Sequence, residues 1–256
     1  MESYGIILAA GKGNRMRDEA APAEFPKVLR QANGRPLIGY VIDVLRGSGI
    51  RDISIVVGFG ADYIRRTLGG GYRYILQTEQ LGSGHAVACA REALGGRRGQ
   101  AIVMCGDSPL LTVQTVSSLE DRQASTGAVV ALVSAVLDDP AGYGRIKRAG
   151  DGGIMGVIEE ACASDDEKAI REINGGAYAF DSAWLWANIG LIEPNRAGEL
   201  NLTDLVRVAV AQGMRVESVP ASPEEVMGVN TPAELARVEE TLRRRAASGG
   251  RSPAPG

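Results

Sequence analysis

Tyr4-Gly-Ile-Ile-Leu-Ala-Ala-Gly-Lys-Gly-Asn-Arg-Met16 is the stretch that decides the fold of this 256-residue chain. Residues 4–10 form a short apolar run that ends in glycine, which is typical of a buried parallel strand. The small residues at 11–13 then let backbone N–H groups approach a phosphate chain, and Lys12 and Arg15 supply positive charge. The stretch therefore predicts a strand that leads directly into a glycine-rich loop.

Two common phosphate-binding loops are excluded by residue identity. A dinucleotide-binding fingerprint needs a third glycine where this chain has Met16. A P-loop needs glycine five residues before Gly-Lys, and that position is Ile6. On the loop alone, two interpretations stay open: another kind of phosphate loop, or an ordinary strand-to-helix turn of an α/β protein.

Outward from this stretch, strand and helix patterns alternate through the first half of the chain. Such alternation predicts βαβ units and a mainly parallel sheet that is covered on both faces. The second half has more strand and less helix, which predicts that the same sheet continues with some antiparallel pairing. The expected strands are 4–10, 52–57, 72–76, 101–105, 127–137, 154–160 and 175–180; the expected helices are 36–48, 61–68, 84–94, 203–212 and 232–245.

Composition fits a globular chain, with 45% hydrophobic and 23% charged residues. We expect one domain over residues 1–247 and a disordered tail over 248–256, where Gly, Pro, Ser and Arg dominate. The 28 basic and 31 acidic residues give a net charge of −3, which argues against a protein whose main partner is nucleic acid or an anionic membrane.

Targeting signals and cysteine usage favour a cytoplasmic protein. The chain has no apolar run long enough to cross a membrane, and Met1-Glu2-Ser3 lacks the basic start of a signal peptide. The three cysteines are far apart and show no CxxC spacing, so neither a disulfide scaffold nor a zinc site is expected.

A second motif, Pro26-Lys27-Val28-Leu29, makes the glycine-rich loop more informative when the two are taken together. The pattern LAAGxGxRM followed by Pro-Lys resembles nucleotidyltransferases that join a nucleoside triphosphate to a phosphorylated small molecule. Residues 4–240 as a whole resemble the uridylyltransferase half of bacterial bifunctional N-acetylglucosamine-1-phosphate uridylyltransferases. The resemblance implies an α/β, three-layer, Rossmann-like nucleotidyltransferase fold with a mixed, mainly parallel sheet.

The resemblance also implies a reaction: Mg²⁺-dependent transfer of UMP from UTP to a sugar 1-phosphate. N-acetylglucosamine 1-phosphate is the implied acceptor, and UDP-N-acetylglucosamine and pyrophosphate are the products. The family's β-helix acetyltransferase domain does not follow residue 247 in this chain, so neither acetyl transfer nor the trimer built by that domain is expected.

The implied nucleotide site combines the first loop with Gln77-Thr-Glu-Gln-Leu-Gly-Ser-Gly-His-Ala86. Uracil offers two carbonyl acceptors and one N–H donor, and a glutamine amide carries both complementary groups. His85, the one histidine, is either a catalytic base or a structural residue; the resemblance favours the structural role. Arg15 and Lys27 are the implied catalytic residues, and the implied UTP-binding residues are Leu8, Ala10, Gly11, Gly13, Lys27, Gln77, Gln80, Gly82 and Ser83.

An acidic residue follows the expected strand 101–105, in Cys105-Gly-Asp-Ser-Pro109. The carboxyl end of a parallel strand is where open α/β sheets bind ligands, although Gly-Asp-x-Pro is also good turn chemistry. The resemblance implies that Asp107 and Asn230 are the protein ligands of Mg²⁺, whose other ligands are substrate phosphates and water.

The implied sugar site draws on four later segments, of which Asp139-Pro-Ala-Gly-Tyr-Gly-Arg-Ile146 matches the family motif DPxGYGRI most fully. The residues that the resemblance assigns to the sugar are Gly144, Glu159, Asn174 and Thr203.

Several positions depart from the family pattern, and most lie on the sugar side. The usual Lys-Asp pair is replaced by Ala161 and Cys162, and two aromatic residues are replaced by Leu200 and Asn201. Elsewhere Asn14 stands where Thr or Ser is usual, and residues 18–25 lengthen the loop before Pro26. Because a missing hydrogen-bond partner can change discrimination by orders of magnitude, uridylyl transfer to another hexose 1-phosphate stays open. A nucleotide-sugar sensor without catalysis is the alternative from a different class.

Overall fold

The computed structural model describes residues 2–13 and 25–249. Its centre is a mixed sheet with the strand order β11-β7-β10-β6-β1-β4-β5. The first-half strands β1 (Ser3–Ala9), β4 (Ile53–Val57), β5 (Arg73–Leu76) and β6 (Gln100–Cys105) pair in parallel. These four elements confirm the predicted strands, and the fully buried run of β4 shows the pattern of a parallel strand that is covered on both faces.

Antiparallel pairing enters with β10 (Glu172–Asp181), which lies between β6 and β7 (Val130–Val136) and runs opposite to both. The edge strand β11 (Val216–Pro220) is parallel to β7. Beside β10, β8 (Arg145–Arg148) and β9 (Ile154–Ile158) form an antiparallel hairpin. The sheet is therefore mixed, as the second half of the sequence predicts.

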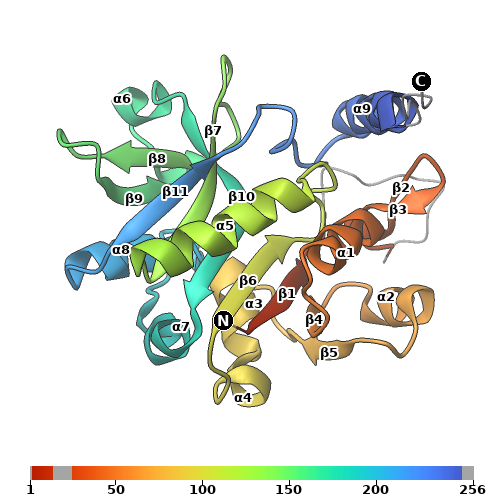
Figure 1. The fold of residues 1–256 in the computed structure, drawn as a ribbon, viewed down its shortest axis with the longest axis horizontal. Coiled ribbons are helices and arrows are strands. Elements are labelled where there is room, and N and C mark those ends of the chain that lie inside the picture. Colours follow the sequence, from red (N-terminus) through yellow and green to blue (C-terminus); the bar gives the residue numbers. More distant parts are fainter. Residues whose placement is uncertain (1, 14–24, 250–256) are drawn as a thin grey trace, which may run out of the picture.

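Helices cover the two faces of the sheet, which gives the three expected layers (Figure 1). One face packs against α1 (Leu37–Gly47), α2 (Ala61–Leu68) and α5 (Val113–Thr126). The other face packs against α3 (Ser83–Cys89), α4 (Arg91–Leu94), α7 (Ser182–Asn188) and α8 (Asp204–Ala211). Successive side chains of β1 alternate between these cores, with Ile6 in one and Ile7 in the other.

A third, smaller core lies at one end of the molecule. It joins α9 (Pro232–Gly249) to the hairpin of β2 (Gln31–Ala32) and β3 (Arg35–Pro36) (Figure 1). We call it the end core; its buried members are Ala32, Leu37, Leu110, Val229 and Val238. The short 3₁₀ helix η2 (Lys27–Leu29) leads into this hairpin. The end core thus packs together segments from the early, middle and late parts of the sequence.

The remaining described elements are short. The turn after β9 contains a 3₁₀ helix, η3 (Glu160–Cys162), and α6 (Asp165–Lys168), which has a complete capping box at Ser164 and Glu167. A further 3₁₀ helix, η4 (Ile189–Leu191), follows α7. These short helices lie in the connections between the larger elements and are not part of the main layers.

Several elements differ from the sequence-based expectation. The pattern did not predict α5, because its buried face includes Thr115 and Gln123, and the Gln123 amide donates to the carbonyl of Ala128 at 2.7 Å. Nor did it predict α7 or β11. The helix expected over 84–94 is two helices, because a tight turn at Ala90, with its N–H on the Val87 carbonyl at 2.9 Å, ends α3.

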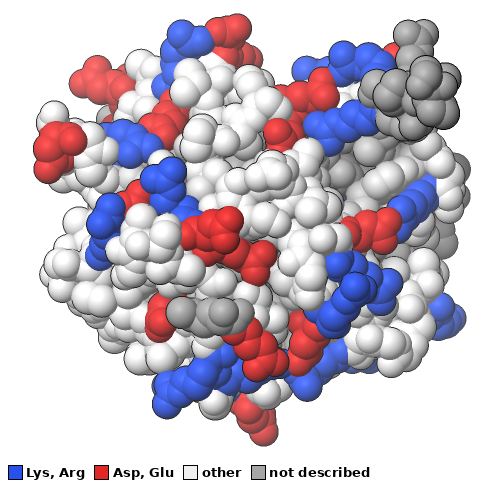
Figure 2. Space-filling view, viewed as in Figure 1, with Lys and Arg blue, Asp and Glu red and all other residues white. Residues whose placement is uncertain are grey.

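The proposed domain limits stay a prediction. The backbone of α9 runs to Gly249, and residues 250–256 of the expected tail lie outside the described residues. Within the described part of the chain, no helix combines the length and apolarity needed to cross a membrane. Figure 2 shows acidic and basic side chains interleaved over the viewed face, without one large patch of either sign.

Candidate active site

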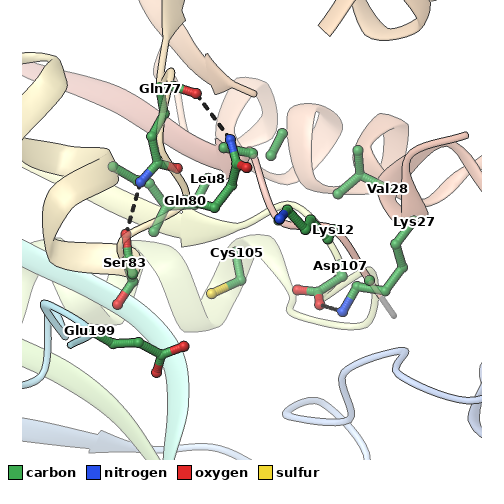
Figure 3. A pocket seen from close by; sticks show the side chains of 16 residues that line it. Leu8, Lys12, Lys27, Val28, Gln77, Gln80, Ser83, Cys105, Asp107 and Glu199 are labelled. Atoms are coloured by element: carbon green, nitrogen blue, oxygen red, sulfur yellow. Dashed lines mark hydrogen bonds and ion pairs between the residues drawn. The ribbon is translucent and has the colours of Figure 1, made fainter. Parts of the chain in front are cut away.

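A cavity of about 440 Å³ opens where β1 and β6 end, at the carboxyl edge of the parallel strands. Figure 3 shows Gln77, Gln80 and Ser83 at one end and Lys12, Lys27 and Asp107 at the other. This position is the usual ligand site of an open α/β sheet. All nine residues assigned to UTP line the cavity, together with Ala9, Lys12, Val28, Ala86, Cys105, Asp107 and Glu199.

The glycine-rich loop is shaped by close contacts on both sides. Gly106 donates its N–H to the Leu8 carbonyl at 2.9 Å, so the loop after β1 lies against the loop after β6. Gly13 has a φ of +59°, and a Cβ there would lie 2.8 Å from the Cβ of Lys27. Glycine at this position therefore lets Lys27 approach the loop. Asn14 and Arg15 lie outside the described residues.

Lys27, Asp107 and Asn230 meet at the basic end of the cavity. The Lys27 ammonium donates to the Asp107 carboxylate and, at 2.9 Å, to the Asn230 side-chain oxygen. A backbone bond of 3.1 Å from the Val229 N–H to the Asp107 carbonyl holds the two oxygen-bearing segments together. The structure thus joins three residues that the sequence places in three separate motifs.

The oxygen pair of Asp107 and Asn230 fits a hard divalent cation. Both oxygens accept from the same nitrogen atom, so they converge on one positive charge. Carboxylate and amide oxygens are the ligands that Mg²⁺ takes from proteins, usually one or two of them beside phosphates and water. Among the residues described, no three His, Cys, Asp or Glu side chains gather into a fuller cage.

The segment assigned to uracil is held in shape by its own amides. Gln77 is buried, with 3% of its surface exposed, and its side-chain nitrogen donates to the Gly82 carbonyl at 3.1 Å. Gln80 donates to the Gln77 carbonyl at 3.2 Å. His85 Nδ1 lies 3.0 Å from the Gln77 nitrogen and 2.9 Å from the Glu79 carbonyl oxygen. Because His85 is bonded within this segment and does not line the cavity, its contacts fit the structural role.

A second segment, residues 199–203, runs directly alongside the uracil segment. Leu200 donates to the Leu81 carbonyl and accepts from the Gly84 N–H, both at 2.7 Å. Ser83 Oγ accepts from the Leu202 N–H at 2.9 Å. A Cβ on Gly82 would lie 2.5 Å from the Leu200 carbonyl oxygen, so glycine is required for this contact.

The four residues assigned to the sugar form two bonded pairs outside the lining of this cavity. Thr203 donates to the Glu159 carboxylate at 2.7 Å, and Asn174 donates its backbone N–H to the Gly144 carbonyl at 2.9 Å. The Asn174 amide nitrogen donates to the Tyr178 hydroxyl at 2.6 Å. Residues 199–203 therefore connect the two parts of the site, because they contact both the uracil segment and Glu159.

Burial perturbs two groups in this region. Burial raises the pKa of Glu159, and the Thr203 hydroxyl opposes that effect by its hydrogen bond. Burial likewise raises the pKa of the Cys105 thiol to about 12, and the Asp107 charge adds to the effect. The thiol is therefore neutral at physiological pH and is a packing group rather than a nucleophile.

Among the residues that line the cavity, sequence reasoning left Glu199 and Cys105, with some others, without an assigned role. The Glu199 side chain lies below Ser83 in Figure 3, on the side of the cavity nearest the sugar segments. Its place in the motif Glu199-Leu-Asn-Leu-Thr-Asp204 was a usable signal. The close contact of the Leu200 backbone gave no signal, because it involves no particular side chain.

Comparison with known proteins places this site in a family. Residues 5–150, more than half of the chain, match the MobA-like NTP transferase domain. The chain belongs to the MobA-like NTP transferase family. The match covers the glycine-rich loop, Lys27, the uracil segment and Asp107, all of which line the cavity.

Two relatives of this chain are bifunctional GlmU proteins. The chain is 41% identical over 247 residues to that of Pelotomaculum thermopropionicum and 40% identical over 247 residues to that of Exiguobacterium sibiricum. Each alignment covers 96% of this chain but only 53% and 54% of the respective relative, so the chain spans about half their length. The resemblance seen in the motifs is thereby confirmed over nearly the whole chain.

The fold is also that of a solved NTP transferase. A putative glucose-1-phosphate thymidylyltransferase from Bacillus anthracis, crystallised with sucrose, aligns with a TM-score of 0.76 over 94% of this chain and 95% of its own. At 21% sequence identity the likeness concerns the fold alone. It confirms the α/β, Rossmann-like nucleotidyltransferase architecture.

Proposed function

We propose that this NTP transferase moves UMP from UTP to a sugar 1-phosphate, and that N-acetylglucosamine 1-phosphate is the acceptor. The observation that carries the proposal is the meeting of Lys27, Asp107 and Asn230 beside a cavity lined by the complete assigned nucleotide set. Similarity to the GlmU proteins supports both the nucleotide and the acceptor.

The reaction needs positioning and charge neutralisation rather than a covalent enzyme intermediate. A phosphate oxygen of the sugar 1-phosphate, already anionic, attacks the α-phosphorus in line, and the bond to the bridging oxygen breaks as pyrophosphate leaves. Lys27 stabilises charge on the α-phosphate, and the backbone of Gly11–Gly13 holds the leaving phosphates. Arg15 is proposed to hold the leaving phosphates together with that backbone.

We propose Mg²⁺ as the resident cation, held by the Asp107 and Asn230 oxygens. When bound, the cation neutralises phosphate charge and orients the triphosphate. Lys27 then turns from the two oxygens toward the α-phosphate, since its long side chain already reaches both partners. Replacing Asp107 with Asn should raise the Mg²⁺ concentration needed for half-maximal rate, and an unchanged Mg²⁺ titration would contradict the ligand assignment.

The deciding experiment is pyrophosphate release with UTP and Mg²⁺ across a panel of sugar 1-phosphates. CTP, GTP, ATP and dTTP are compared with the best acceptor. We expect turnover with UTP and N-acetylglucosamine 1-phosphate. Turnover with another nucleotide would overturn the role of the uracil segment.

A second candidate acceptor, another hexose 1-phosphate such as glucose 1-phosphate, is favoured by the changes on the sugar side. Leu200 and Asn201 lie in the segment that ends at Thr203, and Cys162 is exposed in the turn after Glu159. Turnover with that sugar alone would assign specificity to these positions. Tight UDP-sugar binding by the folded protein, with no pyrophosphate release across the panel, would instead indicate a sensor.

A further inference from the structure

Arg145 is the largest fully buried side chain of the described residues, with 1% of its surface exposed. It begins β8, where it pairs with Ile158 of β9 and with Ile173 of β10. A guanidinium stays charged in proteins, so this position holds a permanent positive charge away from water. A buried charge of this kind is tolerated only when partners in the protein replace the water.

The partners of Arg145 come from three different segments. Its guanidinium forms an ion pair of 2.8 Å with the Glu160 carboxylate, donates to the Tyr143 carbonyl, and lies 3.4 Å from the Lys168 carbonyl oxygen. Glu160 in turn accepts the Gly142 N–H at 3.2 Å. Glu160, in the turn after β9, therefore contacts both Arg145 and the loop before β8, and the charge pair holds that loop against the turn.

These two segments carry two of the four residues assigned to the sugar. Gly144 lies between Tyr143 and Arg145, and Glu159 directly precedes Glu160. A Cβ on Gly144 would lie 3.5 Å from a Glu159 carboxylate oxygen, so the two segments face each other closely. Asn174 contacts the first of these segments through its N–H on the Gly144 carbonyl.

We propose that Arg145 and Glu160 are a positioning pair that sets the separation of Gly144 and Glu159, and thereby the affinity for the sugar 1-phosphate. Neither residue lines the nucleotide cavity, so the effect is confined to the acceptor. The proposal rests on the proposed function, because it assigns a role at the same sugar site.

Glu160 is the residue to test, because its side chain is 37% exposed and lies in the 3₁₀ helix η3, outside the sheet. Glu160→Gln keeps the size and one acceptor oxygen but removes the charge, and Glu160→Ala removes the contacts of this side chain with both Arg145 and the Gly142 N–H. The matched control is Glu167→Gln, which neutralises the exposed pair of 2.9 Å with Lys147 on the same strand, β8. Arg145→Met is a supplementary variant, since it leaves Glu160 unpaired and changes the core, and either effect can prevent folding.

The first readout is the KM for each substrate. We expect Glu160→Gln to raise the KM for the best sugar 1-phosphate roughly ten- to a hundredfold, as small displacements of binding groups do, and to leave the KM for UTP unchanged. Glu160→Ala should have the larger effect, and Glu167→Gln none. Equal changes in both KM values, or no change in the sugar KM, would overturn the proposal.

The second readout, amide hydrogen exchange, does not depend on turnover. Glu160→Gln should speed exchange in residues 142–146 and 158–162, whereas Glu167→Gln should not. Unchanged exchange in both segments would overturn the positioning role whatever the activity. If the unmodified protein uses no sugar phosphate, the proposed function fails, and the exchange data still decide whether the pair fixes the two segments.

Discussion

At the scale of single residues, Lys27 occupies the position that depends most closely on its length and charge. Its ammonium lies between two oxygens that the proposed mechanism gives to a cation, and a glycine opposite makes room for its side chain. The proposed mechanism therefore gives this residue one set of partners without substrate and another with it. A shorter or neutral side chain would serve neither.

Replacing Lys27 with Ala should lower turnover at least about a hundredfold, as removal of an oxyanion-type donor does. Pyrophosphate release at saturating substrates is the measurement. Lys168→Ala, at an exposed position whose ammonium lies 3.9 Å from Asp165, is the control and should be neutral. A Lys27→Ala protein that keeps most of its turnover would refute the catalytic role.

Glu159 couples stability to pH. Burial raises its pKa, so the folded state holds this proton more tightly than the unfolded chain, and stability falls as the pH rises through the range where the group ionises. Glu159→Gln should therefore unfold at a higher temperature than the unmodified protein at neutral pH. The difference should vanish below a pH of about 4, where both states are protonated.

Glu172 is the matched control for Glu159, because its pKa is shifted in the opposite direction. The ion pair with Arg148 lowers the pKa of Glu172, so Glu172→Gln should lower the unfolding temperature at neutral pH. Thermal unfolding across a pH series measures both variants. A Glu159→Gln protein that is less stable at neutral pH would show that the carboxylate is needed in its charged form for folding.

At the scale of elements, the contact between the start of α3 and residues 199–203 controls the uracil end of the cavity. Gly82 has a φ of +106° and lies against the Leu200 backbone, so two separate constraints exclude a side chain there. Backbone groups have no flexible end that could move aside.

Gly82→Ala should destabilise the fold by roughly 1–3 kcal/mol, the usual cost of a strained backbone, and should weaken UTP binding more than tenfold. Calorimetry with UTP and thermal unfolding are the measurements. Gly70→Ala is the control, because that glycine has open space around it and an ordinary φ. Normal UTP affinity in Gly82→Ala would mean that this contact does not shape the uracil segment.

Elements were predictable from sequence where burial is apolar and continuous. The β4 and β6 runs are buried almost throughout, and their alternation with amphipathic helices identified the parallel half of the sheet. In contrast, α5 turns Gln123 toward the core and satisfies it with the Ala128 carbonyl, which leaves no clear apolar period. The strand β11 is short and half-exposed, so its pattern resembles that of a loop.

At the scale of the whole molecule, the end core holds together the three segments that carry Lys27, Asp107 and Asn230. Val229 precedes Asn230, Leu110 follows Asp107, and Ala32 follows Lys27, and all three side chains are completely buried in this core. Sequence motifs predicted which residues belong to the site. They could not predict this shared anchor, because its members are ordinary apolar residues scattered along the chain.

Leu110→Ala should destabilise the protein by about 2–5 kcal/mol, as other large-to-small core substitutions do, and should also raise the Mg²⁺ concentration needed for half-maximal rate. Leu94→Ala is the matched control, since Leu94 is equally buried but lies in a core that does not contact the oxygen pair. It should lose similar stability and keep the Mg²⁺ response. Identical Mg²⁺ titrations for both variants would separate the end core from the cation site.

The position of Asn230 has a consequence for protein synthesis. A ribosome makes the chain from its N-terminus, and N-terminal units generally fold first. The glycine-rich loop, the uracil segment and Asp107 emerge together with the parallel half of the sheet, whereas Asn230 emerges only at the start of α9. A nascent chain can thus fold the strands and loops that carry most of the nucleotide cavity first, and it gains Glu199 and then the second oxygen, with it the means to neutralise a triphosphate, only when the later segments have emerged.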